Sequence, residues 1–135
     1  MTSSIKRVGP KEAWQALNDD HRARLIDVRS TVEFKYVGHP LNAVHVVWKE
    51  FPDWEENAHF GTQVAAALGE AGSDAPIYLI CRSGARSFAA AERLAEQGYT
   101  HLHNVEEGFE GDRDDNHHRG TINGWRFHGL PWEQG

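Results

Sequence analysis

The sequence contains a single cysteine, Cys81, and lacks any long hydrophobic run. One cysteine excludes an intrachain disulfide and an all-cysteine metal site, and it fits a reducing compartment. No stretch approaches the roughly 20 apolar residues of a transmembrane helix. Residues 1–10 carry Lys6 and Arg7 but no apolar run after them, so they do not have the pattern of a secretory signal. We therefore expect a cytoplasmic protein that makes no use of a membrane.

Basic residues are the minority among the charged ones. Lys and Arg total 14 against 20 Asp and Glu, a formal net charge of −6. A general nucleic-acid binder presents a basic face, so we do not expect nucleic acid as a partner. The chain has 135 residues, 39% of them hydrophobic, which is enough to form one hydrophobic core without disulfides or a structural metal. Since no repeat or linker divides it, the sequence predicts one domain over 1–135.

Apolar patterns alternate between strand and helix along the chain. Strands are predicted at 24–28, 43–48, 77–80 and 101–105, and helices at 10–17, 64–68 and 86–97, with a brief helical turn at 30–36. The run at 77–80 is apolar at every position, which is typical of a central strand covered on both faces. This alternation predicts an α/β fold around a mainly parallel sheet.

The segment 106–120 differs from the rest of the chain. It is rich in acidic residues and glycines, so we expect an irregular, polar excursion that could form one wall of an active-site cleft. Beyond it lie apolar side chains that we expect to pack the chain end back onto the domain: Trp125, Phe127, Leu130 and Trp132.

Histidines offer one possible metal site. His101 and His103 alternate on a predicted strand and so share a face. His117 and His118 lie in the excursion close to three aspartates: Asp112, Asp114 and Asp115. Paired histidines in a polar loop are more often solvated, and the aspartates match no EF-hand spacing. The sequence therefore predicts no metal.

The strongest chemical signal is the segment 80–87, Ile-Cys-Arg-Ser-Gly-Ala-Arg-Ser. Cys81 follows a predicted strand directly and precedes a helix, the position at which parallel α/β sheets place their active sites. Backbone N–H groups at the start of a helix favour the thiolate, as do Arg82 and Arg86, and all of them attract an anionic substrate. Gly84 allows the loop to curl.

We therefore predict Cys81 as a catalytic nucleophile. The predicted substrate-binding residues are those of the loop that follows it: Arg82, Ser83, Gly84, Ala85 and Arg86. Free cysteines are often simply buried, and on that alternative Cys81 is a core residue and the two arginines are surface charges. The glycine, the arginines and the junction of strand and helix favour the reactive interpretation.

Several short segments, in order along the chain, resemble the boxes of single-domain rhodanese-like sulfurtransferases. They are Leu25–Arg29 with Glu33-Phe34, Gly38-His39 with Ala43, Cys81–Ser87, Asn104–Gly108, and Gly124-Trp125 with Gly129–Trp132. The second box departs from the family pattern, because Pro40 stands where the family commonly has isoleucine after Gly-His. The resemblance covers nearly the whole chain.

The resemblance implies a rhodanese-like fold, with helices on both faces of the central sheet. It also implies that Cys81 attacks the sulfane sulfur of an anionic donor such as thiosulfate and becomes a persulfide. A thiophilic acceptor then removes the sulfur: cyanide in the test tube, or a cellular thiol, possibly on a protein. No metal or organic cofactor is implied.

Two other functions remain open on the sequence. Phosphatases and arsenate reductases of related fold also use a cysteine in an anion-binding loop, typically with a His-Cys pair and five residues before the arginine. Here Ile80 precedes Cys81, and four residues separate it from Arg86, the shorter loop that the resemblance associates with sulfane sulfur. A non-catalytic binding module of the same family often loses the cysteine, which is present here.

Overall fold

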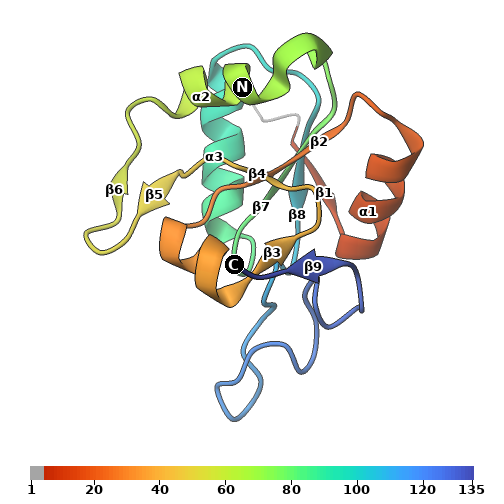
Figure 1. The fold of residues 1–135 in the computed structure, drawn as a ribbon, viewed down its shortest axis with the longest axis vertical. Helices are drawn as coiled ribbons and strands as arrows, with labels where there is room; N and C mark the ends of the chain where they lie inside the picture. Colours follow the sequence, from red (N-terminus) through yellow and green to blue (C-terminus); the bar gives the residue numbers. More distant parts are fainter. Residues whose placement is uncertain (1–4) are drawn as a thin grey trace.

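The computed structural model describes residues 5–135 and is built on a five-stranded parallel sheet (Figure 1). The strand order is β1 (Lys6–Val8), β8 (Leu102–Val105), β7 (Ile77–Ile80), β2 (Arg24–Asp27) and β4 (Val44–His45), and every neighbouring pair is parallel. The apolar strand β7 lies at the centre, as its sequence predicts.

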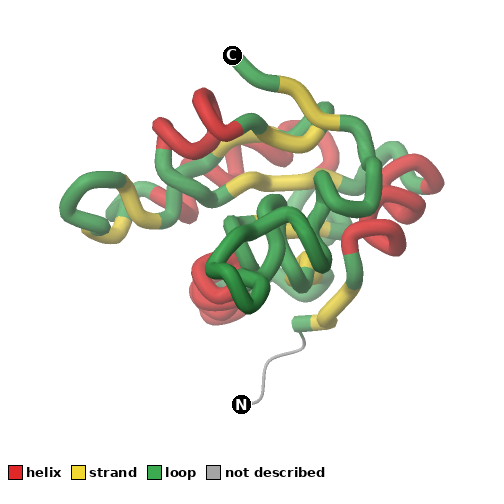
Figure 2. The backbone as a smooth tube through the Cα atoms, turned by 90° about the horizontal axis from the view of Figure 1, so that it is seen from below, coloured by secondary structure: helices red, strands yellow, loops and turns green. Residues whose placement is uncertain are grey.

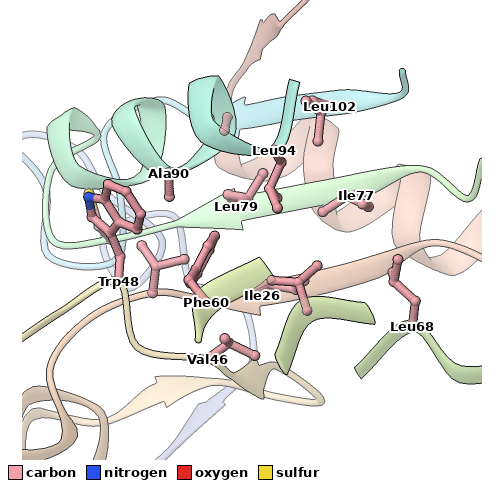
Figure 3. Packing of buried hydrophobic residues seen from close by; sticks show 14 residues of the cluster. Ile26, Val46, Trp48, Phe60, Leu68, Ile77, Leu79, Ala90, Leu94 and Leu102 are labelled. Carbon is pink, nitrogen blue, oxygen red and sulfur yellow. The ribbon is translucent and has the colours of Figure 1, made fainter. Parts of the chain in front are cut away.

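Helices cover both faces of this sheet. Helix α1 (Pro10–Asp19) lies on one face, and α2 (Phe60–Leu68) and α3 (Ala85–Glu96) lie on the other (Figure 1). Because successive side chains of a strand point to opposite faces, β2 and β7 supply both cores. Ile26 and Leu79 pack with α2 and α3 (Figure 3). Leu25 and Ile80 pack with α1 on the opposite face. The predicted α/β fold with a central parallel sheet is confirmed.

Two antiparallel strand pairs lie outside the sheet. Strand β3 (His39–Pro40) pairs with β9 (Trp132–Glu133), which brings the chain end back beside the second box. Strand β5 (Lys49–Glu50) pairs with β6 (Glu55–Glu56) in a hairpin that projects from the body of the molecule (Figure 1). A π-helical turn (Glu33–Val37) and a 3-10 turn (Gly69–Ala71) complete the elements.

The predicted strand at 43–48 is wrong in extent. Only Val44–His45 pairs with β2, and the chain then leaves the sheet while its backbone still bonds to the end of β2, from Val46 N to the Asp27 carbonyl (3.1 Å). Trp48 packs in the core against Phe60 (Figure 3). Val46 and Trp48 are buried, and the N–H of Trp48 donates to the Val28 carbonyl (3.0 Å), so the residues after β4 combine core packing with backbone bonds beyond the end of β2.

The chain end is only partly packed as expected. Trp125 is fully buried and Leu130 packs beside it, but Phe127 is 47% exposed and Trp132 is 40% exposed. The segment 106–120 contains turns and bends but no helix or strand, as predicted (the loop in the foreground of Figure 2). Within residues 5–135, no helix combines the length and apolarity needed to cross a membrane.

Candidate active site

Cys81 lies at the carboxyl end of the central strand β7, directly before the loop that leads into α3. Its side chain is buried, and its Sγ accepts a hydrogen bond from the backbone N–H of Gly84 (3.1 Å). Gly84 adopts φ +113°, a conformation that L side chains rarely adopt, and this turns the loop so that its amide points back at the sulfur. The Cys81 sulfur thus has one backbone donor in place, supplied by the loop that precedes α3.

A second contact to the sulfur comes from Ser87 on the first turn of α3. Its buried hydroxyl lies 3.3 Å from Cys81 Sγ and 2.5 Å from Asn104 Oδ1. Two hydrogen bonds orient the side-chain amide of Asn104: its Nδ2 donates to the Gly84 carbonyl (3.1 Å) and to the Glu106 carboxylate (2.6 Å). Asn104 therefore ties the end of β8 to the Cys81 loop, and its oxygen shares the Ser87 hydroxyl with the sulfur.

Arg86 is held by an ion pair that sequence reasoning did not identify. Its guanidinium donates to both carboxylate oxygens of Glu33, at 2.8 and 2.9 Å, and the two side chains are 18% and 13% exposed. Glu33 also accepts from the Ser30 hydroxyl (2.7 Å), and the Trp54 ring lies 5.3 Å from the guanidinium carbon. The spacing of Ser30 and Glu33 is that of a capping box, so their mutual contact could be predicted from the sequence. Nothing local in the sequence indicates that Glu33 also pairs with Arg86.

Burial works to raise the pKa of Glu33, but hydrogen bonds from Arg86 and Ser30 and the charge of Arg86 outweigh it and lower the pKa to about 2. Because the carboxyl pKa is lower in the folded protein, the ionised Glu33 stabilises the fold at pH values above the ordinary carboxyl pKa of about 4.3. This contribution is lost as the pH falls toward 2. We expect Glu33→Gln to cost about 2 kcal/mol of unfolding free energy at pH 6 and about half as much near pH 3. Urea unfolding at both pH values measures this, and a cost independent of pH contradicts it.

The loop opens onto a cleft of about 500 Å³. Its walls are formed by Lys49, Trp54, Cys81, Arg82, Ser83, Ala85 and Arg86. Five of the six residues predicted from the Cys81 segment thus line one cleft, and the sixth, Gly84, supplies the amide bonded to sulfur. Lys49 and Trp54 come from the β5–β6 hairpin and were missed, because that hairpin gives no strand-length apolar pattern in the sequence.

The first part of the 106–120 segment lies behind the loop rather than in the cleft. The N–H of Phe109 donates to the Cys81 carbonyl (2.8 Å), and those of Glu110 and Gly111 donate to the Arg82 carbonyl (3.0 and 3.2 Å). None of the residues that line the cleft belongs to this segment, so the expectation that it forms a cleft wall is wrong. Its observed role is to anchor the backbone of the Cys81 loop.

The histidines do not gather into a site. Within residues 5–135 no three His, Cys, Asp or Glu side chains lie where they could hold one metal ion. Asp114 instead accepts hydrogen bonds from the backbone N–H of Asn116 and His118 and from the Thr121 hydroxyl, so it organises its own loop. His101 precedes β8 and is exposed.

The model of the Rhodanese-like domain matches residues 9–115. This chain belongs to the rhodanese-like domain family. An uncharacterized protein, RC0915 of Rickettsia conorii, is 32% identical over 132 residues, which cover 96% of this chain and 98% of that protein. The thiosulfate sulfurtransferase GlpE of Haemophilus influenzae is 32% identical over 108 residues, covering 80% of this chain and 88% of GlpE.

A solved structure extends the likeness to three dimensions. The crystal structure of Rv0390 from M. tuberculosis superposes with a TM-score of 0.82 at 39% identity, covering 97% of this chain and 98% of that one. The resemblance inferred from the short sequence boxes is therefore confirmed at the level of family and fold, and the chain falls in a superfamily of sulfurtransferases.

Proposed function

We propose that this rhodanese-like chain is a sulfurtransferase that carries sulfane sulfur on Cys81 and takes it from a small anionic donor such as thiosulfate. The observation that carries the proposal is the environment of Cys81 Sγ: a backbone N–H at 3.1 Å and a hydroxyl at 3.3 Å, at the edge of a cleft that also contains cationic side chains. Contacts to the sulfur beside cationic side chains suit a cysteine nucleophile that reacts with an anionic donor.

The reaction divides into two displacements. The Cys81 thiolate attacks the outer sulfur of thiosulfate, the S–S bond of the donor breaks, and sulfite leaves with the bonding electron pair. Cys81 then carries a persulfide whose terminal sulfur is attacked by the acceptor, cyanide in an assay or a thiol in a cell. The Cys81 thiolate is restored as the sulfur leaves on the acceptor.

Each residue of the loop has a part in this proposal. The backbone N–H groups of 82–86 are to serve as donors to the anionic persulfide, and that of Gly84 already bonds to the Cys81 sulfur. Arg82 and Arg86 supply positive charge to the donor, and the Glu33 partner of Arg86 fixes the position of that arginine. Ser83 and Ala85 line the cleft with side chains small enough to leave room for the donor.

Intact-mass measurement after incubation with thiosulfate tests the proposal. We expect a gain of one sulfur atom in the wild type, released by cyanide as thiocyanate, and no gain in Cys81→Ser. Ser73→Ala, which changes an exposed serine outside the cleft, is the control and should still take up sulfur. Hydrolysis of an aryl phosphate without sulfur uptake would instead support the phosphatase alternative.

A further inference from the structure

The cleft contains three cationic side chains, and they differ in their partners. Arg86 is engaged by both oxygens of Glu33. Within residues 5–135, no carboxylate lies within ion-pair distance of either Lys49 or Arg82. Lys49 and Arg82 therefore bring to the cleft, beside Arg86, positive charge that no carboxylate of the described residues pairs with.

The acidic residues around Lys49 are already engaged elsewhere. Glu56 lies directly opposite Lys49 in the β5–β6 register, but its carboxylate pairs with Arg93 of α3 at 3.4 Å. Glu50, the next residue along the chain, accepts from the backbone N–H and the hydroxyl of Thr31, at 2.8 and 2.7 Å. Lys49 itself is half-buried and lines the cleft beside Cys81.

We propose that Lys49 binds the anionic end of the sulfur donor and selects small oxyanions such as sulfonates for the Cys81 site. This inference rests on the proposed function. An ammonium group is a compact charge with three N–H donors, and it lacks the fixed planar geometry of a guanidinium group. It can therefore bind a tetrahedral oxyanion in several orientations. Arg82 supplies a second positive charge, and Trp54 closes one side of the cleft with an aromatic ring that stacks over Arg86.

Alkylation of Cys81 by two reagents of similar size tests this without any sulfur chemistry. Iodoacetate is anionic and iodoacetamide is neutral, so the ratio of their rates measures how far the cleft attracts negative charge. We expect Lys49→Gln to lower the ratio of iodoacetate to iodoacetamide about five-fold, the effect of one partly solvated charge contact. Lys49→Arg should keep most of the ratio.

Lys11→Gln is the matched control, because it removes the same charge from an exposed position on α1, away from the residues that line the cleft. An unchanged ratio in Lys49→Gln, or an equal fall in Lys11→Gln, would overturn the assignment. Sulfur-transfer kinetics provide the second measurement: Lys49→Gln should raise KM for thiosulfate about five-fold with little change in kcat. If the wild type takes up no sulfur, the proposed function fails while the alkylation ratio still decides whether Lys49 attracts anions.

Discussion

Replacing Gly108 with alanine is expected to displace the Cys81 loop and to lower the rate of persulfide formation by more than about ten-fold. Gly108 adopts φ +69°, and a Cβ built there would lie 2.6 Å from the Cys81 carbonyl oxygen and 2.5 Å from the carbonyl carbon of Arg82. Both neighbours are backbone atoms of the Cys81 loop, so neither can move aside without moving the sulfur. We expect unfolding to become easier by about 2–4 kcal/mol, from backbone strain and overpacking together.

Gly129→Ala separates these two causes. Gly129 has nearly the same φ, +75°, but a Cβ there would meet nothing within 4 Å. This variant should therefore lose only about 1 kcal/mol, the cost of a left-handed backbone for alanine, and should keep wild-type sulfur uptake. Urea unfolding and the rate of persulfide formation are measured on both variants. Equal losses in the two proteins would mean that the contact of Gly108 with the Cys81 loop has no importance of its own.

Much of the fold could be predicted because the sequence patterns of its helices and strands are local. The apolar run at 77–80 predicts a central strand, and Pro10 predicts the helix that starts there. Strand β1 was missed, because two of its three residues, Lys6 and Arg7, are exposed and only Val8 is buried. Pairing with β8 stabilises this strand, and the hydrophobic pattern of residues 6–8 does not reveal that partner.

The candidate site divides in the same way. Cys81 and its loop were found because nucleophile, glycine and arginines lie within a few residues of one another. The partners that organise the loop come from 53 and 17 residues away, in the pairs Arg86–Glu33 and Ser87–Asn104. Only the folded sheet brings β8, the turn after β2 and the β5–β6 hairpin to one edge, so such contacts follow from topology rather than from spacing.

Asp27→Asn is expected to be the most destabilising single change of charge, costing about 3–5 kcal/mol of unfolding free energy. Asp27 and Arg29 are both fully buried at the end of β2, joined by bonds from Arg29 Nε (2.9 Å) and Nη2 (2.6 Å). Arg29 also donates to the Gly38 carbonyl (2.6 Å), and its guanidinium lies over the Phe109 ring. The substitution leaves the buried positive charge of Arg29 without its counter-ion. The Nη1 of Arg29 already lacks a hydrogen-bond partner.

The exposed pair Arg22–Asp74 provides the control, since its side chains are 42% and 73% exposed. Asp74→Asn should leave the free energy of unfolding nearly unchanged, because water screens the charge that remains. The double replacement Asp27→Leu with Arg29→Met should recover most of the stability lost in Asp27→Asn, since it removes both buried charges at once. If the double variant is as unstable as the single one, the cost lies in lost packing or hydrogen bonds around Gly38 and Phe109, and the unpaired charge of Arg29 is not its cause.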